Sequence, residues 1–476
     1  MWGLGMFTQY YPEDAALTVE LRNQVEAFIA GKWDAAMLAA HQTRKLREVV
    51  AFARDNSPFY GERLVGVTDE VIAALHPGNL RDLPFTTKDD LRRAQFDMLS
   101  RPLSDAWIFY ETTGTTGVAT PCPRTNVDSL HNNTILTAYY RDIFGARGSG
   151  QVIGISGPSE LHSTGDTFGD VCRSLGHAVA KMWPHSPMVG FDRALELMRR
   201  LPVTGLFCTP GMAMHLAQRA IDAGLRPRLD FSLDLLLLTG ELLSPSLLTN
   251  IGLLWDAEVH NVLYASQEAS VLAAATSDGR LRTAPLINLY EVIDPDSGEP
   301  VDSDGAGQCY GELVVTNLYL GAKPLIRYRT GDLVRMTESG VSAAVPAPSV
   351  EVLGRAHDRL TLNGHLISGY DFENLLLGQF RGFCDYQVTI KRDDAGVDRV
   401  ALTLRSDPTI GFPSVEGAVQ QCLDELDTPL TVRFGTPGAI TGTGAMVSWK
   451  AARVIDQRTG QSDEVEAAEN IAASRS

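Results

Sequence analysis

Short apolar runs alternate with helix-like segments between residues 150 and 270, and this alternation restricts the fold more than any other feature. Four runs have the length and composition of buried strands: Val152 to Ile155, Gly205 to Cys208, Leu233 to Leu238 and Val259 to Tyr264. Between two of them, apolar residues recur at helical spacing from Met212 to Ile221. Strands that alternate with helices predict an α/β architecture with a largely parallel sheet, which binds ligands at the carboxyl ends of its strands.

A change of composition near residue 345 divides the chain. Residues 340–349 (GVSAAVPAPS) are small, uncharged and contain proline, which is typical of a connection between domains. We therefore predict a large N-terminal domain over residues 1–354 and a small α+β domain over residues 355–460. The small and charged residues 461–476 are expected to form a frayed tail.

Charge and cysteine usage exclude several classes of protein. With 41 basic and 58 acidic residues, the net charge of −17 argues against broad binding to nucleic acid or anionic membrane. No apolar run approaches the roughly 18 residues of a membrane span, and the N-terminus lacks the features of a signal peptide. The six cysteines form no C-x-x-C pair, which fits a reducing compartment. We expect a cytoplasmic protein, and the sequence leaves its oligomeric state open, a homodimer included.

Three short segments carry residues suited to a nucleotide. Residues 110–117 (YETTGTTG) form a threonine- and glycine-rich loop, whose backbone N–H groups and hydroxyls can surround a polyanion. In YRTGD, Asp332 follows a glycine turn and can bind the two hydroxyls of a ribose. In YASQE, at a strand end, Tyr264 can cover a base and Glu268 can ligate Mg²⁺. Taken alone, each segment also has an ordinary interpretation as a surface turn, a capped turn or a core tyrosine.

In their order along the chain, these segments resemble the adenylate-forming (acyl-AMP) superfamily. A Gly-Arg pair at the domain junction, Gly354-Arg355, and the late lysine Lys450 complete that order. Three further segments are similar to the phenylacetate–CoA ligase branch: residues 57–60 (SPFY), 83–91 (LPFTTKDDL) and 324–332 (PLIRYRTGD). In the second of them, Thr86 and Asp89 have the spacing of a helix capping box. The resemblance covers roughly residues 40–458, and it implies a large α/β domain of mixed sheets and helices with a small α+β domain on a hinge.

The resemblance implies a two-step reaction in which a carboxylate attacks the α-phosphate of ATP and a second nucleophile then displaces AMP. It assigns ATP binding to residues of the large domain: Thr112, Thr113, Gly114, Thr115, Thr116, Gly117, Gly240, Glu241, Tyr264 and Asp332. The implied catalytic residues are Lys450, Glu268 and Arg355. In these roles Glu268 holds Mg²⁺, and Lys450 bridges the attacking carboxylate and the α-phosphoryl oxygen. The hinge falls at His357, and a thiol tunnel passes beside Gly364.

Several positions depart from the family's pattern. Gln267 stands where a threonine usually precedes the glutamate, His357 replaces the usual hinge aspartate, and Trp449 replaces the glycine before the lysine. Many members carry a Cys-x-Cys-Gly segment that forms a structural zinc site. Residues 345–350 (VPAPSV) contain no cysteine, so we predict no zinc. The histidines match no common metal-site spacing. We expect most of them to be structural and one or two to line the acid pocket.

We therefore expect a ligase that adenylates an aromatic or arylalkenoic carboxylate with ATP and Mg²⁺ and transfers it to CoA. The departures also suit an enzyme of secondary metabolism with another acceptor or acid: a carrier-protein thiol, an amine, or nitrite activated for diazotisation of an aryl amine. An inactive nucleotide-binding relative is a third interpretation, which the presence of Glu268, Asp332, Arg355 and Lys450 disfavours. The acid pocket is expected between the phosphate loop and the strand ends near residues 205–212 and 236–242.

Overall fold

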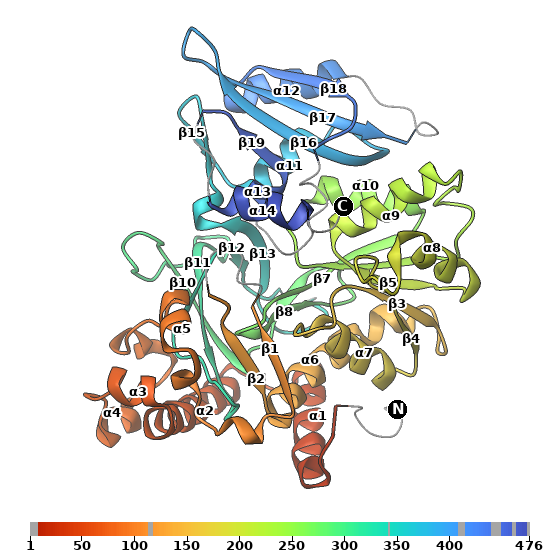
Figure 1. The fold of residues 1–476 in the computed structure, drawn as a ribbon. Coiled ribbons are helices and arrows are strands. Elements are labelled where there is room, and N and C mark those ends of the chain that lie inside the picture. Colours follow the sequence, from red (N-terminus) through yellow and green to blue (C-terminus); the bar gives the residue numbers. More distant parts are fainter. Residues whose placement is uncertain are drawn as a thin grey trace.

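The computed structural model describes residues 8–112, 118–340, 343–407, 415–438, 449–458 and 463–473. Within these ranges, an eleven-stranded mixed sheet crosses the larger part of the molecule (Figure 1). Its strands are β3 (Val152–Ser156), β4 (Ala178–Lys181), β5 (Gly205–Cys208), β6 (Leu235–Thr239), β7 (Glu258–Ser266), β8 (Ser270–Ala275), β9 (Leu281–Thr283), β10 (Asn288–Ile293), β11 (Gln308–Asn317), β12 (Tyr328–Thr337) and β13 (Ser349–Arg355). Their order is β10-β11-β12-β13-β9-β8-β7-β6-β5-β3-β4. The predicted α/β fold class is confirmed.

The four strands predicted from apolar runs are β3, β5, β6 and β7, and together with β4 they form the parallel part of the sheet. Both faces of β6 are covered. Leu235 and Leu237 belong to one buried hydrophobic cluster, whereas Leu236 and Leu238 belong to a second cluster on the other face. A strand that is buried on both faces is apolar throughout rather than alternating, which explains the run of leucines.

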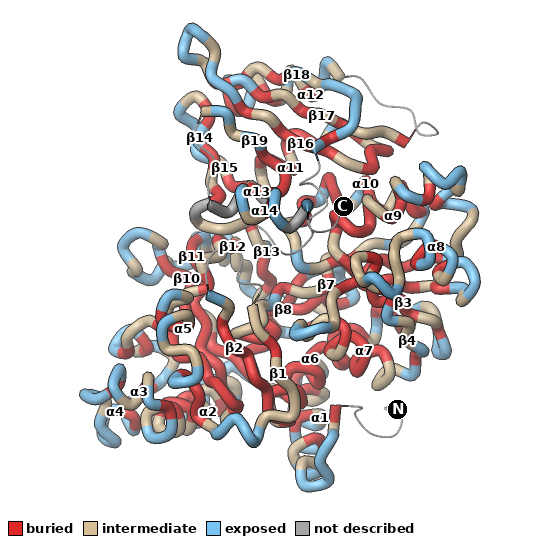
Figure 2. Tube along the Cα trace, viewed as in Figure 1, coloured by how far each residue is buried: buried red, intermediate tan, exposed pale blue. Residues whose placement is uncertain are grey.

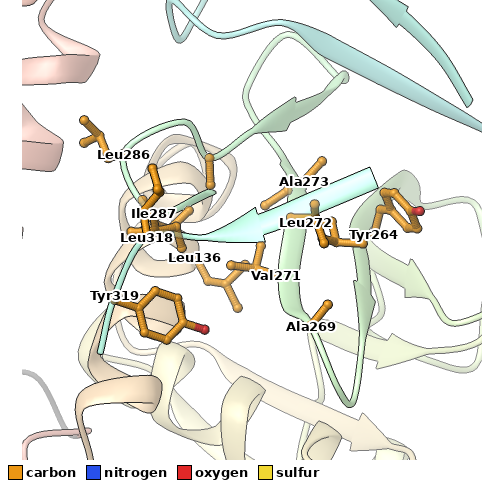
Figure 3. Packing of buried hydrophobic residues seen from close by; sticks show 14 of the residues in the cluster. Leu136, Tyr264, Ala269, Val271, Leu272, Ala273, Leu286, Ile287, Leu318 and Tyr319 are labelled. Carbon is orange, nitrogen blue, oxygen red and sulfur yellow. The ribbon is translucent and has the colours of Figure 1, made fainter. Parts of the chain in front are cut away.

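The helices of the large domain surround this sheet: α1 (Ala15–Ile29), α2 (Ala35–Asn56), α3 (Pro58–Arg63), α4 (Asp69–Ala74), α5 (Lys88–Ala94), α6 (Asn126–Gly145), α7 (Thr164–Ser174), α8 (Gly190–Arg200), α9 (Pro210–Asp222) and α10 (Pro245–Trp255). Helix α6 is buried on nearly all sides. Figure 3 shows its Leu136 among apolar side chains of β8 and the neighbouring segments, which are Val271, Leu286, Ile287 and Leu318. Before α6, the hairpin of β1 (Ile108–Glu111) and β2 (Pro121–Arg124) flanks the predicted phosphate loop.

Helix α5 begins one residue later than the sequence predicted. The capping box is formed by Thr87 and Asp90, not by Thr86 and Asp89. Thr86 is used in tertiary structure instead. Its N–H donates to the carbonyl of Arg327 at 3.0 Å, and its carbonyl accepts from the N–H of Arg329 at 2.9 Å. Both threonines have an acidic residue at the required spacing, so the pairing with residues 327–329 decides which of them caps the helix.

The residues from 355 onward, which we call the small domain as predicted, contain a hairpin, a four-stranded sheet and four α-helices in their described parts. Its elements are β14 (Leu360–Leu362), β15 (His365–Ile367), α11 (Gly369–Leu377), β16 (Phe383–Arg392), β17 (Asp398–Ser406), α12 (Val415–Leu426), β18 (Leu430–Phe434), α13 (Trp449–Arg453), β19 (Val454–Asp456) and α14 (Asp463–Ala473). The order in the sheet is β18-β17-β16-β19. Part of the segment expected to fray thus forms helix α14, in which Ala468 is fully buried.

The small domain packs against α9 and α10 of the large domain (Figure 1). The two domains share one hydrophobic cluster, which includes Leu247 and Ile251 of α10 together with Phe372 and Phe383 of the small domain. Asn250 adds three hydrogen bonds across the boundary, one of them accepted from the N–H of Phe383 at 3.2 Å. Its Nδ2 donates to the carbonyl of Phe383 at 2.7 Å, and its Oδ1 accepts from the N–H of Gly382 at 2.7 Å. The interface therefore consists of buried apolar side chains, and the side-chain amide of Asn250 within it is hydrogen-bonded.

Glu373 of α11 is a buried carboxylate at this interface. It accepts hydrogen bonds from the backbone N–H and hydroxyl of Ser244, at 3.2 and 2.7 Å, and from the hydroxyl of Tyr386 at 2.8 Å. Burial nevertheless raises the pKa of Glu373 above its ordinary 4.5. Folding therefore favours the protonated carboxyl, and this contribution to stability is present at low pH and is lost as pH rises through the raised pKa.

We expect Glu373→Gln to remove this pH-dependent loss of stability, because glutamine does not ionise. Glutamine is also nearly isosteric with glutamate and keeps an acceptor for Ser244. As pH rises above 4.5, the melting temperature of the wild type should fall relative to that of the variant. Thermal melts between about pH 4 and 8 would measure this difference. Glu62→Gln, at an exposed residue of α3, is the matched control. Parallel curves for the wild type and Glu373→Gln would contradict the prediction.

Buried residues are concentrated in the central strands and in α6, whereas the outer helices and loops are exposed (Figure 2).

Among the helices in the described ranges, none combines the length and the apolar character that a bilayer span requires.

Candidate active site

Three side chains from three strands meet near the carboxyl end of β7. Tyr264 comes from β7, Asp332 from β12, and Arg355 ends β13 directly opposite Asp332. The hydroxyl of Tyr264 donates to Oδ2 of Asp332 at 2.8 Å, and Nε of Arg355 lies 3.0 Å from Oδ1. Arg355 also donates to the carbonyl of Thr330 at 3.1 Å. The structure thus brings together three of the residues singled out in the sequence.

The two donors fix the orientation of the Asp332 carboxylate. Burial raises the pKa of the Tyr264 hydroxyl and Asp332 raises it further, so the phenol keeps its proton. Asp332 in turn raises the pKa of Arg355, which stays charged. Each carboxylate oxygen has a second lone pair, so Asp332 retains acceptors for a diol. In Figure 3, Tyr264 lies at the margin of the buried cluster, with its hydroxyl directed away from the other labelled residues.

Glu268 follows the end of β7, and it is ionised. The hydroxyl of Tyr328 donates to its Oε1 at 2.7 Å. Burial acts to raise the pKa of Glu268, but the charge of Lys88, the bond from Tyr328 and the charge of Lys323 outweigh burial, so the pKa is lowered from 4.5. An ionised carboxylate with one oxygen held by a hydroxyl suits a hard cation such as Mg²⁺, because its remaining lone pairs are free to coordinate.

Two motifs that are far apart in the sequence form one structural unit beside Glu268. Thr86 forms a parallel bridge with Tyr328, which brings Lys88 close enough to act on Glu268. Arg327 holds the unit together. It pairs with both oxygens of Glu291, donates to the carbonyl of Leu83 at 2.8 Å, and lies 4.0 Å from the centre of the Phe85 ring. Lys88 and Tyr328 lie within the segments 83–91 and 324–332, but no pattern in the sequence indicates that they act on Glu268.

Gln267, the departure beside Glu268, binds the loop that follows β3. Its Oε1 accepts from the hydroxyl of Ser163 at 2.5 Å, and its Nε2 lies 3.5 Å from the carbonyl of Leu161. The same carbonyl accepts from the N–H of Glu111 at 3.1 Å, at the end of β1. Gln267 therefore links the end of β7 to the loop over β3 and to the strand that leads into the phosphate loop.

Gly240 and Glu241 follow β6. Gly240 has a φ of +84°, which favours glycine. Oε2 of Glu241 accepts from the N–H of Gly211 at 2.9 Å, at the N-terminus of α9. The negative charge of Glu241 also raises the pKa of Arg453 in the small domain. In this arrangement the Glu241 side chain serves a helix terminus and the domain boundary, and its assignment to ATP stays a prediction.

The other predicted residues lie outside the described residues or apart from this group. Thr113, Gly114, Thr115, Thr116 and Gly117 are outside the described residues, while Thr112 closes the base of their loop through hydrogen bonds with the backbone of Thr120 at 3.1 and 2.9 Å. Gly364 has a φ of +91° between β14 and β15. His357 lies in the short 3₁₀ helix Ala356–Asp358 after β13.

Lys450 is half-buried in α13. Within the described ranges, no hydrogen bond or ion pair joins it to Glu268, Asp332 or Arg355. Lys450 does lower the pKa of Asp456 in the following strand, where the hydrogen bonds and charge of Arg458 act more strongly. The structure therefore does not bring this lysine into the Tyr264–Asp332–Arg355 group.

Residues 345–350, which lack the family's cysteines, pack into the core around Arg282. Val345 and Ala347 are buried, and Nη1 of Arg282 donates to the carbonyl of Ala347 at 3.1 Å. The other end of this guanidinium pairs with Asp278 at 2.5 Å. Among the described residues, no cluster of three or more histidine, cysteine or acidic side chains has the arrangement of a metal site.

Comparison with known proteins gives relatives over most of the chain. No family model matches the sequence. A phenylacetate-coenzyme A ligase of Thermus thermophilus is 26% identical over 368 residues, which cover 75% of this chain and 79% of the relative. The Pseudomonas putida enzyme of the same name is 29% identical over 338 residues, covering 69% and 72%. That of Aromatoleum evansii is 24% identical over 440 residues, covering 88% and 94%.

Solved structures share the fold. A 2-hydroxyisobutyryl-CoA ligase in the postadenylation state, in complex with 2-HIB-AMP, matches with a TM-score of 0.71 at 23% identity, covering 92% of this chain and 93% of that one. The same ligase with CoA in its thioesterification state matches with a TM-score of 0.60 at 24% identity, covering 89% and 90%. Motifs, relatives and fold therefore agree: this chain is a relative of the phenylacetate–CoA ligases, built on the adenylate-forming fold, and the prediction of an AMP-forming, ligase-like enzyme is confirmed.

Proposed function

We propose that this protein adenylates an aromatic or arylalkenoic carboxylate with ATP and transfers the acyl group to CoA. The observation that carries the proposal is the Asp332 carboxylate, oriented by Tyr264 and Arg355 beside the ionised Glu268. Relatives named phenylacetate-coenzyme A ligase support an aryl acid and CoA as substrates.

Each residue of this group has a role in the proposal. Asp332 accepts the ribose hydroxyls of ATP, Tyr264 packs on the adenine, and Arg355 adds positive charge near the ribose and the phosphate. Glu268 fits Mg²⁺ because it is ionised and one of its oxygens is already held by Tyr328. The metal ion, when bound, would neutralise charge on the phosphates of ATP. Lys450 would stabilise the charge that develops between the carboxylate and the α-phosphate.

Pyrophosphate release from ATP, measured with a panel of aryl acids, tests the adenylation step. Acyl-CoA formation in the same reactions tests the acceptor. We expect pyrophosphate release that depends on an aryl acid, and an acyl-CoA product only when CoA is present. Pyrophosphate release with nitrite and without a carboxylic acid would show that nitrite is the activated acid. An amide product in place of a thioester would show that the acceptor is an amine and not CoA. Absence of release with every acid would overturn the proposal.

We expect Asp332→Asn to raise the dissociation constant of ATP by about 10- to 100-fold, because charge-assisted hydrogen bonds to the ribose become neutral ones. Titration calorimetry with ATP measures this change, and the melting temperature reports whether the fold persists. Tyr264→Phe is the matched control, since it removes only the hydroxyl that orients Asp332 and should cost less. An unchanged affinity of Asp332→Asn for ATP would show that Asp332 does not bind the nucleotide.

A further inference from the structure

Arg124, the last residue of β2, is a buried cation that forms no ion pair with any of the described residues. The described residues include four arginines that are at least 95% buried, and three of them have a carboxylate partner. Arg282 pairs with Asp278 at 2.5 Å, Arg327 with Glu291 at 2.8 Å, and Arg453 with Asp385 at 2.6 Å. Arg124 is only 5% exposed, and within the described part of the chain its guanidinium makes no hydrogen bond or ion pair.

The groups around Arg124 are rings and a thiol. Its guanidinium carbon lies 5.1 Å from the centre of the Tyr110 ring. Its charge also acts on His162, Cys122 and Tyr319, each of which has a pKa shifted mainly by burial. None of these groups is a carboxylate, and burial keeps the tyrosines and the thiol protonated. The guanidinium therefore lies among neutral groups.

The nearby carboxylates are committed to other donors. Asp166 accepts from the hydroxyl of Tyr110 at 3.1 Å and pairs with Lys181 at 2.8 Å. Asp128 caps α6 through Thr125 and accepts from the N–H of Ala322 at 3.0 Å. A second buried cation, Lys323, lowers the pKa of Glu268, so its charge has a counterpart there. Of these two cations, Arg124 is the one for which the described residues provide no carboxylate partner.

His162 supplies a second hydrogen-bond donor near Arg124, whose charge acts on the imidazole ring. Its Nδ1 accepts from the N–H of Thr164 at 3.3 Å and lies 2.8 Å from the hydroxyl of that residue. Because a backbone N–H can only donate, Nδ1 is the acceptor and the proton of the neutral ring is on Nε2. Burial and the charge of Arg124 lower the pKa of His162 to about 4, so the ring is neutral near pH 7 and offers one N–H.

Contacts of neighbouring residues place Arg124 and His162 beside the candidate active site. His162 stands between Leu161 and Ser163, which bind Gln267, the neighbour of Glu268. Cys122, two residues before Arg124 and on the same face of β2, is close enough to Glu268 for that carboxylate to raise its pKa. Arg124 and His162 therefore border the region between the β1–β2 hairpin and the end of β7. Strand β7 pairs with β6, one of the strands whose ends are expected to line the acid pocket.

We propose that Arg124 and His162 bind a second carboxylate of the substrate, so that the acid activated by this enzyme is an aromatic dicarboxylate. This proposal rests on the proposed function. An isolated charge that is removed from water is costly unless an anion accompanies it, and guanidinium matches carboxylate through two parallel hydrogen bonds. The rings of Tyr110, Tyr319 and His162 flank the site and suit an aromatic body. One carboxylate is adenylated, and the other stays ionised on Arg124.

Binding measurements with matched acids test the proposal without requiring turnover. We expect isophthalate to bind the wild type about 10- to 100-fold more tightly than benzoate, and 4-carboxyphenylacetate more tightly than phenylacetate, by titration calorimetry. Arg124→Gln should abolish the preference in both pairs, and Arg124→Lys should keep part of it. Arg44→Gln, at an exposed residue of α2, is the control and should change neither pair. Equal binding of mono- and dicarboxylates by the wild type, or an unchanged preference in Arg124→Gln, would overturn the proposal.

Stability without ligand provides an independent measurement. If the role of Arg124 is to bind substrate, Arg124→Met should raise the melting temperature of the ligand-free protein by about 1–3 °C. The variant removes an uncompensated buried charge and keeps most of the apolar part of the side chain. Isophthalate should then stabilise the wild type and not Arg124→Met. A lower melting temperature in ligand-free Arg124→Met would make Arg124 a structural residue. If nitrite binds in a way that depends on Arg124 and dicarboxylates do not bind, the ligand of Arg124 is a small anion and not a second carboxylate of the substrate. Failure of pyrophosphate release alone would count against the proposed function and not against this binding site.

Discussion

Lys450→Ala should reduce adenylate formation by at least about 10²–10³-fold while ATP still binds. A cation that bridges the attacking carboxylate and the α-phosphoryl oxygen neutralises charge that peaks in the transition state, and loss of such a group costs this much in rate. Pyrophosphate release measures the rate, and titration calorimetry measures the affinity for ATP. A large fall in rate with a small change in affinity is the expected combination, because Asp332 and Glu268 remain.

The structure indicates how the small domain holds this lysine. Helix α13 is anchored by Arg453, which pairs with Asp385 at 2.6 Å and donates to the carbonyl of Tyr386 at 3.0 Å. The same guanidinium reaches the N-terminus of α9, where a Cβ on Gly211 would lie 3.4 Å from it. Lys450 precedes Arg453 by three residues, so the two lie on neighbouring positions of the helix surface. The anchor keeps Lys450 beside the large domain.

Two controls separate a catalytic role from a general effect of charge. Lys391→Ala removes an exposed lysine of β16 in the same domain and should leave the rate unchanged. Lys450→Arg keeps the charge but spreads it over a planar group, so it should recover only part of the rate. Pyrophosphate release by Lys450→Ala at the wild-type rate would show that the role taken from the family does not apply to this chain.

The strands were predictable where burial on both faces leaves a simple pattern. The run from Gly205 to Cys208 coincides with β5, and the leucines of β6 fill both layers of the core. Other features depend on contacts between distant parts of the chain. Thr86 and Thr87 fit a capping box equally well in the sequence, and only the pairing with residues 327–329 distinguishes them. Local patterns carry no information about such contacts.

The same limit applies to the candidate site. The motifs drew attention to Tyr264, Asp332 and Arg355, and the structure joins their side chains. No sequence pattern distinguishes Arg124, because a single arginine at the end of a short strand is common. Its meaning comes from burial and from the absence of a carboxylate partner among the described residues, and both are properties of the fold. An unpaired buried charge becomes visible only when every neighbour is known.

His357→Pro should leave adenylation largely intact and reduce product formation by about 10²-fold or more. Arg355 is held by Asp332 and Thr330, so rotation of the small domain would begin just after it. It would also have to separate Asn250 from Phe383, and Glu373 from Ser244. Proline fixes φ near −65°, a value that 3₁₀ helices use, so the present arrangement is retained. A second step that needs another φ would then lack its geometry, and misplacement by about 1 Å can cost about 10²-fold.

Separate measurements of pyrophosphate release and of final product test the hinge. His357→Ala removes the ring but leaves φ free, and His357→Asp restores the residue usual in the family, so both variants should catalyse both steps. Melting temperatures of the three variants show whether the domain interface persists. If His357→Pro forms pyrophosphate and final product at equal, near-wild-type rates, the enzyme completes its reaction without rotation at this residue. The interface of α9 and α10 with the small domain would then stay closed throughout catalysis, and the second substrate would have to reach the adenylate by a path that leaves this interface intact.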